Sequence, residues 1–313
     1  MTPSRAFVLA AIVGALTAQA RAVDLEHTRN RHLLPPRLAS KTAAALGVSR
    51  PLRPRRATRV VSVPDLHWAA IAGDLDAVQR LLAAGSSLTA TETLWGGERA
   101  LHWGAYGGHP GVVQALIAAG ASIETRDDDG ETALREALRT DGSGFLTLQA
   151  LLVAGANPEA RSRHDSTALH EAVSLLNKHA PVAVHLLRMF GADPNVTMGD
   201  SKTTPLHLAA LQPFDRFGGW PLIDATIDPN GRAADINARD SDGRTPLHWV
   251  VIGPGSAQDL QVVVWLIDHG VDVNVTDDSG STALDYAVAI GEGTKDLADL
   301  LRIVTTTTQS GAQ

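Results

Sequence analysis

One short phrase recurs along most of this chain, and its spacing limits what the chain can fold into. The phrase is an apolar stretch that opens on a leucine, which falls at positions 66, 101, 134, 169, 206, 247 and 284. Successive spacings are 35, 33, 35, 37, 41 and 37 residues. A period of this length, with one helix start in each copy, is typical of stacked units that bury their apolar sides only against one another. The sequence therefore predicts a solenoid rather than a domain built around one core.

The copy at residues 240–251, DSDGRTPLHWVV, indicates the local structure of one unit. Gly243 can take the positive φ of a tight turn without a steric penalty. Thr245 is predicted to cap the next helix through its hydroxyl, and Pro246 to occupy the first helical position, where a missing N–H costs nothing. The stretch LQVVVWLIDHG has the apolar spacing of a second helix that ends at Gly270. Each unit is thus predicted to contain a turn and two helices.

These copies resemble the ankyrin repeat. The resemblance is carried by TPLHLAA at residues 204–210, TPLHWVV at residues 245–251 and the hairpin endings GANPEARS, GADPNVTM and GVDVNVTD. It covers about residues 62–304, which are predicted to be the repeat domain. It implies an all-α ankyrin-repeat solenoid of about seven helix-turn-helix repeats with β-hairpin-like fingers.

The resemblance also implies a role for the histidine that follows the leucine. In ankyrin repeats this side chain braces the turn of its own repeat and of the adjoining one through hydrogen bonds. The histidines at this position are His67, His102, His170, His207 and His248. A residue type that recurs in this way is architectural rather than catalytic. Arg135 and Asp285 replace it in the third and seventh copies, where less regular joints between repeats are expected.

The N-terminus has the pattern of an export signal. Arg5 precedes the apolar run AFVLAAIVGALTA and the small-residue stretch AQARA, which ends at Ala22. This order is typical of a secretory signal peptide, so residues 1–22 are predicted to be one, and the chain to be secreted or periplasmic. The run is too short to span a membrane comfortably, so no stable span is expected after cleavage. An uncleaved anchor and an organelle transit peptide remain alternatives.

Residues 23–61 have the composition of a disordered linker rich in proline and arginine. Residues 1–61 hold ten Arg and one Lys against Asp24 and Glu26, whereas the whole chain has a formal net charge of −7. The repeat domain is therefore acidic. Because nucleic acid requires a concentrated basic surface on the folded part, it is not expected to be a partner.

The linker contains one further motif. The stretch RPLR, from Arg50 to Arg53, resembles the RxLR translocation element of secreted pathogen effectors. A plain spacer is the alternative for so arginine-rich a tract. At the other end of the chain, residues 305–313 are predicted to be a polar tail.

No constellation typical of an enzyme occurs in the sequence. The chain has no cysteine, which excludes a thiol nucleophile and a thiolate metal site. It also lacks a G-x-S-x-G elbow, an H-E-x-x-H helix, a P-loop and a dinucleotide glycine motif. Neither catalysis nor a cofactor nor a metal ion is therefore expected.

Repeat proteins vary at the surface that they use for recognition, which places the candidate binding residues on finger tips, inner helices and insertions. Those mapped to tips are Trp95, Asp128, Asp129, Glu131, Arg163, His164, Asp242 and Arg244, and those on the inner helices include Tyr106 and Arg139. The fifth copy has the longest spacing, and its extra residues include Phe214, Phe217 and Trp220. Because aromatic residues dominate binding hot spots, the aromatic members of this set are candidate anchors.

Local packing is the alternative for Trp95 and for the insertion in the fifth copy. Core packing is predicted for the tryptophans that directly follow the repeat histidine, which are Trp68, Trp103 and Trp249. Asn195 and Asn274 each begin an N-x-T sequon and could accept glycans in a eukaryotic secretory route. Backbone hydrogen bonding within the hairpin is the favoured interpretation for both asparagines.

The predicted function is an exported scaffold that binds another protein through its concave face and finger tips. A basic partner would complement the acidic repeat domain, and the chain itself is expected to be a monomer. The alternatives are a periplasmic guard or immunity-type protein, an accessory protein of an envelope enzyme, and a secreted effector delivered into a host cell.

Overall fold

The computed structural model describes residues 65–91, 96–140, 144–175, 179–211, 233–253 and 259–310. The chain divides into two compact units, Met1–Val63 and Pro64–Gln313, and all the described residues belong to the second. The predicted signal peptide and linker lie outside the described residues. So do four candidate binding residues, Trp95, Phe214, Phe217 and Trp220.

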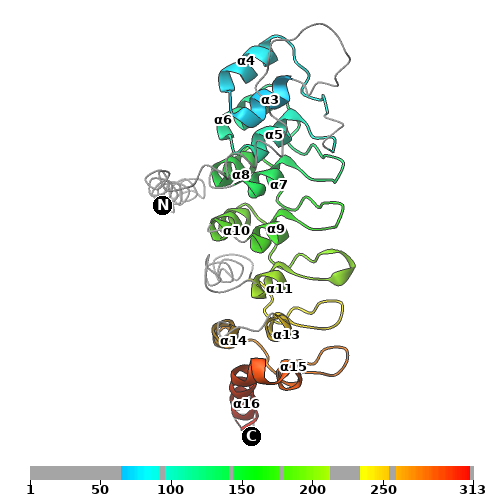
Figure 1. Cartoon of the computed structure of the whole chain (residues 1–313), viewed down its shortest axis with the longest axis vertical. Coiled ribbons are helices and arrows are strands. Elements are labelled where there is room, and N and C mark those ends of the chain that lie inside the picture. Colours follow the sequence, from blue (N-terminus) through cyan, green and yellow to red (C-terminus); the bar gives the residue numbers. More distant parts are fainter. Residues whose placement is uncertain are drawn as a thin grey trace, which may run out of the picture. The chain divides into compact units, whose positions relative to one another are not determined.

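The second unit is a stack of helix pairs (Figure 1). The first helices of the pairs are α3 (Asp65–Ala72), α5 (Ala100–Tyr106), α7 (Ala133–Glu136), α9 (Ala168–Ser174), α11 (Pro205–Ala210), α13 (Pro246–Ile252) and α15 (Ala283–Ile290). The second helices are α4 (Leu75–Ala83), α6 (Pro110–Ala118), α8 (Gly144–Val153), α10 (Ala180–Met189), α14 (Asp259–Asp268) and α16 (Lys295–Ser310). The 3-10 turns η2 (Ala137–Arg139), η3 (Gly199–Ser201) and η4 (Glu292–Thr294) complete the described elements.

Each predicted copy has its first helix at the expected leucine. The predicted insertion in the fifth copy falls within residues 212–232, which the structure does not describe. Helix α16 includes residues 305–310, where a polar tail is predicted. Gly243 and Gly270 take the positive φ predicted for them, at 74° and 85°.

Extended fingers precede the first helices and all project to one side of the stack (Figure 1). Among the described residues they form isolated β-bridges and no sheet, at Arg126–Thr132, Met198–Thr203 and Thr276–Thr282. The all-α solenoid with hairpin-like fingers is therefore confirmed. The surface formed by the first helices and the fingers is called the inner face below.

The core is a column of leucines, with alanine and valine around it. Leu66, Leu134, Leu169, Leu206 and Leu247, which open five of the copies, are almost completely buried. Burial of one such side chain stabilises the fold by roughly 2 kcal/mol. Because each repeat contributes so little apolar volume, its stability depends on the neighbours that cover it.

The repeat histidines connect neighbouring repeats. His248 Nδ1 accepts the backbone N–H of Thr245 at 3.1 Å, and its Nε2 lies 3.2 Å from the carbonyl oxygen of Ser281 in the next finger. A ring that accepts at Nδ1 is neutral and donates at Nε2. The same Nε2 contact to a carbonyl of the following finger is made by His67, His102, His170 and His207, at 3.0–3.3 Å. These contacts have the geometry that the bracing role requires.

The predicted cap by Thr245 is present as a capping box with His248: the Thr245 side chain faces the backbone N–H of His248, and His248 Nδ1 accepts the backbone N–H of Thr245. The Thr245 hydroxyl also lies 2.9 Å from His248 Nδ1. Thr167 and Thr204 make the same contact with His170 and His207. In these repeats the ring therefore contacts both the backbone N–H and the hydroxyl of the threonine that precedes its helix.

Arg135 and Asp285 substitute for the histidine in different ways. Arg135 Nη1 donates to the carbonyl oxygen of Ser166 at 3.2 Å, which is the type of carbonyl that the histidines reach elsewhere. Asp285 Oδ2 accepts the backbone N–H of Thr282 at 2.8 Å. The aspartate lacks the second ring nitrogen with which the histidines reach the following finger. The expected irregularity is present at the third copy, where α7 is only four residues long and continues as η2.

Side chains near the base of the fingers form a second set of contacts between repeats. Glu124, Glu159, Asn195 and Asn237 each accept a backbone N–H of the next repeat, at 2.6–2.9 Å. Asn195 also donates its Nδ2 to the carbonyl oxygen of Ala233 at 3.0 Å. The Asn195 side chain therefore bonds the backbone of the next repeat, whereas bonding within its own hairpin is the predicted role.

Acid is expected to unfold the stack, because the bracing histidines are neutral. Burial lowers the pKa of His170 to about 4 and also lowers the pKa values of His102, His207 and His248. A histidine whose folded pKa is depressed stabilises the protein above its unfolded pKa of about 6.5, and this contribution is lost as the pH falls. Between pH 7 and 5.5, the titration of His170 alone should lower the free energy of unfolding by roughly 1 kcal/mol, which urea unfolding measures.

Two variants separate this effect from general acid sensitivity. His170→Gln should be less stable at pH 7 and should show a smaller further loss at pH 5.5. His164→Gln, which changes an exposed histidine in the finger that precedes α9, should keep the full loss. Equal losses in the two variants would contradict a neutral brace at His170.

Candidate functional site

The residue after the repeat histidine forms a column along the inner face. From the first to the last described repeat the column reads Trp68, Trp103, Glu136, Glu171, Leu208, Trp249 and Tyr286. Aromatic residues therefore occupy both ends, and two glutamates occupy the centre. These residues lie on α3, α5, α7, α9, α11, α13 and α15, the first helices of successive repeats (Figure 1).

The first aromatic end is partly open to solvent. The rings of Trp68 and Trp103 meet edge to face, with centroids 5.7 Å apart. Trp103 is 4% exposed, as its predicted core role requires, but Trp68 is 38% exposed. Tyr106, one turn further along α5, is 49% exposed. The prediction of core packing is therefore wrong for Trp68, because no described repeat covers its outer side.

The second aromatic end is tied to the fingers by hydrogen bonds. Trp249 Nε1 donates to Asp240 Oδ2 at 2.8 Å, and the Tyr286 hydroxyl donates to Asp277 Oδ2 at 2.6 Å. The Arg244 guanidinium lies over the Tyr286 ring, 5.9 Å from its centroid. An open recess of about 240 Å³ adjoins Trp249, lined by Leu211, Arg244, Trp249, Ile252 and Gly253.

Ion pairs fill the centre of the inner face. Arg135 Nε donates to Glu171 Oε2 at 2.7 Å and lies 2.8 Å from Glu131 Oε2. Arg139 contacts Glu136 at 2.7 Å, Glu171 at 3.0 Å and Glu131 at 3.6 Å. Two guanidinium groups thus join carboxylates from the third and fourth repeats.

Three carboxyl groups crowd together beside these pairs. Ligating atoms of Glu98, Asp127 and Glu136 lie within 4.8 Å of one another. Glu136 is 2% exposed, and burial raises its pKa to about 8. Burial, helped by the Asp127 charge, raises the pKa of Glu98 to about 7. At neutral pH this group therefore carries fewer than three negative charges.

The structure separates the candidate tip residues into exposed and buried sets. Asp128, Asp129, Arg163, His164 and Asp242 are exposed on the fingers, as predicted. Arg163 pairs with Asp129 at 3.6 Å, and Arg244 with Asp242 at 2.9 Å. Glu131, in contrast, is buried against Arg135, and burial raises its pKa. Its placement at an accessible tip is a prediction that the structure corrects.

Sequence reasoning missed three acidic residues of the centre, namely Glu98, Glu136 and Glu171. Glu136 and Glu171 stand at the repeat position that holds an aromatic residue in four of the other copies, which was an available signal. Glu98 gave no such signal, since the third copy also has a glutamate, Glu131, three residues before its leucine.

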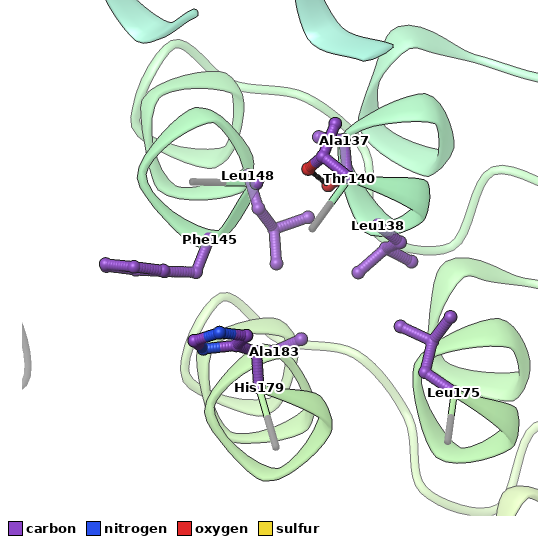
Figure 2. A pocket seen from close by; sticks show the side chains of 9 residues that line it. Ala137, Leu138, Thr140, Phe145, Leu148, Leu175, His179 and Ala183 are labelled. Atoms are coloured by element: carbon purple, nitrogen blue, oxygen red, sulfur yellow. Dashed lines mark hydrogen bonds between the residues drawn. The ribbon is translucent and has the colours of Figure 1, made fainter. Parts of the chain in front are cut away.

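A small cavity between α8 and α10 does not form a binding site (Figure 2). Phe145 and His179 stack at its edge, with centroids 6.2 Å apart, and Leu138, Leu148 and Leu175 line it. Its volume of about 20 Å³ admits roughly one water molecule. Within the described ranges, no helix is long and apolar enough to cross a membrane.

Family models of ankyrin repeats match most of the repeat domain. A three-copy model matches residues 66–162, a single-repeat model residues 164–198, and a many-copy model residues 230–287. Together they cover more than half of the 313 residues. This chain is an ankyrin repeat protein. Its bracing histidines are the members of the repeat phrase that hold one ankyrin repeat to the next.

Solved ankyrin repeat domains share this fold. That of Bcl-3, described as a unique member of the IkappaB protein family, is 27% identical, with a TM-score of 0.59 over 72% of this chain and 93% of that one. The human ASB11 ankyrin repeat domain is 23% identical, with a TM-score of 0.58 over 76% and 96%, a likeness of fold alone.

A viral ankyrin repeat protein is similar over a shorter stretch. The ankyrin repeat protein FPV233 of fowlpox virus (strain NVSL) is 38% identical over 74 residues, which are 24% of this chain and 12% of the viral protein. The chain thus matches only a small part of that protein's length.

Arg135→Ala should destabilise the domain by about 3 kcal/mol. The substitution removes the more buried of the two guanidinium groups that Glu131 and Glu171 share, and it removes the contact to Ser166. The matched control is Arg302→Ala, which breaks an exposed pair with Asp299 and should cost less than about 1 kcal/mol. Urea unfolding measures both, and equal losses would contradict the bracing role of Arg135.

Proposed function

We propose that this ankyrin repeat protein is an exported scaffold that binds another protein through its inner face. The observation that carries the proposal is the exposure of Trp68 and Tyr106 on the inner face. An aromatic side chain that leaves water on binding supplies a large share of interface energy, and Trp and Tyr are enriched at hot spots.

The electrostatics of the inner face favour a basic partner. Its centre holds Glu98, Asp127, Glu131, Glu136 and Glu171 against Arg135 and Arg139, which leaves excess negative charge. Complementary charge accelerates association and selects among partners more than it adds affinity. The scaffold is therefore proposed to bind as a monomer to a basic surface that also presents apolar groups to the aromatic end.

Rigidity supports the same function. The histidine contacts and the finger contacts fix each described repeat to the next, so the inner face is formed before the partner arrives. Binding to a preformed surface avoids the cost of ordering it.

Replacing both exposed aromatics should abolish partner capture. The full-length chain is used as bait in extracts of its native compartment, and the captured protein is then titrated against Trp68→Ala/Tyr106→Ala. The affinity should fall by about 2 kcal/mol or more, roughly thirty-fold, because two anchors are removed. Weaker binding at higher salt would accompany a basic partner.

The control changes an equally exposed apolar residue away from the inner face. Val153 on α8 is 68% exposed, and Val153→Ala should bind like the wild-type chain. Loss of binding in Val153→Ala, with full binding in the double variant, would place the interface on the second helices. Binding that requires only residues 23–61 would make the linker the recognition element.

Export is proposed from residues 1–22 and is tested separately. The full chain, produced in a secreting host, should appear outside the cytoplasm with its N-terminus cut after Ala20 or Ala22, as read by mass spectrometry. Deletion of residues 1–22 should retain it in the cytoplasm. An exported chain that still begins at Met1 would indicate an anchor, and export independent of these residues would contradict the proposal.

The periplasmic guard or immunity-type protein, the envelope-enzyme accessory protein and the delivered effector are variants of this scaffold that differ in the partner. The identity of the captured protein distinguishes them: a toxic enzyme indicates the guard, an envelope enzyme indicates the accessory protein, and a host protein indicates the effector.

A further inference from the structure

The aspartate seven residues before the repeat leucine has the same local geometry in three fingers. Oδ1 of Asp127 accepts two backbone N–H groups of its own turn, at 2.8 and 2.9 Å. Asp240 and Asp277 do the same, with distances of 2.8–2.9 Å. In all three fingers Oδ2 is therefore left to face the first helix that follows.

In the sixth and seventh repeats this second oxygen meets a donor. Asp240 Oδ2 accepts the Trp249 indole N–H, and Asp277 Oδ2 accepts the Tyr286 hydroxyl. Asp277 also has Arg244 of the preceding finger 4.0 Å away. These contacts lower the pKa of Asp277, chiefly through hydrogen bonds from Ser279 and Tyr286.

The third repeat has carboxyl groups at both of these positions. Glu136 stands where Tyr286 stands in the seventh repeat, two residues after the leucine. Glu98 stands where Arg244 stands, three residues before the leucine of the preceding repeat. Asp127 therefore faces two further acids at a joint where its counterpart Asp277 faces a phenol and a guanidinium.

The cations around this joint are already shared. Arg139 is 2.7 Å from Glu136 but also serves Glu131 and Glu171, and its side chain is partly exposed. No described Arg, Lys or His comes within 4.0 Å of a Glu98 or Asp127 carboxylate in an ion pair. The remaining charged or titratable neighbours direct their polar atoms elsewhere: Arg99 to the carbonyl of Arg126, His102 to that of Thr125, and Arg135 to Glu131, Glu171 and Ser166.

We propose that Glu98, Asp127 and Glu136 hold a proton between them, and that its loss weakens the joint between the second and third repeats. A protonated Glu136 or Glu98 would supply the O–H donor that Trp249 and Tyr286 supply in the later repeats. Without the proton, three carboxylates of two repeats repel one another around one shared guanidinium.

The resulting pH dependence runs opposite to that of the histidines. The raised pKa values, about 7 for Glu98 and about 8 for Glu136, exceed the value of about 4.3 for an unfolded glutamate. A group with this shift stabilises the fold at low pH, and the contribution is lost as the pH rises through the folded pKa. The joint should therefore loosen between pH 6 and 9, whatever partner the inner face binds.

Thermal unfolding of the full chain tests the proposal. The wild-type Tm should fall by roughly 2–4 °C between pH 7.5 and 8.8, a range that lies above the titration of the histidines. In Glu136→Gln, whose amide can donate to Asp127 at any pH, less than half of this fall should remain. Glu98→Gln, at a less buried site, should have the same effect, and it provides the test if Glu136→Gln does not fold. Asp76→Asn, an exposed acid on α4, should keep the whole fall.

Hydrogen exchange locates the effect. In the wild type, amide exchange of peptides within residues 96–139 should accelerate at pH 8.8 by more than the pH dependence of intrinsic exchange accounts for. In Glu136→Gln this extra acceleration should be absent. A wild-type Tm that does not fall, or an unchanged fall in both glutamine variants, would overturn the proposal. A pH dependence that vanishes when a chelator removes divalent cations would also overturn it, since the joint would then hold a cation.

Discussion

The hydrogen bond from a neutral histidine to the next finger is the interaction on which this stack depends. One ring links two repeats, because Nδ1 accepts from the start of its own helix while Nε2 donates to a carbonyl of the following repeat. Leucine burial supplies most of the free energy, but it fixes neither the rotation nor the spacing of neighbours. The directional bond does both, and it thereby sets where each finger and each inner-face residue lies.

The inner face varies from repeat to repeat because the residue after the repeat histidine is not needed for the brace and can therefore differ. Aromatic residues there extend the contact between repeats and donate to finger aspartates, as Trp249 and Tyr286 do. Glutamates there need cations, and Arg135 and Arg139 provide them. The third repeat thus replaces an imidazole brace by a guanidinium that both reaches the next repeat and neutralises its acids. This exchange concentrates charge at the centre of a surface whose ends are aromatic.

The repeat period was enough to predict the fold, the first helices and the bracing histidines, because each depends on residues that recur. Predictions that depended on one copy were less reliable. Glu131 is polar and adjoins a turn, which suggested an accessible tip, but Arg135 four residues later draws it inward. Trp68 matches Trp103 in sequence and differs in exposure, a difference that their shared repeat position does not reveal. The crowding of Glu98, Asp127 and Glu136 combines two repeats and needed the three-dimensional register.

The most direct test of the brace is the protonation state of the histidine rings, measured by long-range nitrogen–proton NMR on the full chain at pH 7. Neutral rings with the proton on Nε2 are expected for His102, His170, His207 and His248, since each Nδ1 accepts a backbone N–H. Rings that carry the proton on Nδ1, or that are charged at this pH, would contradict the hydrogen bonds that hold the repeats together.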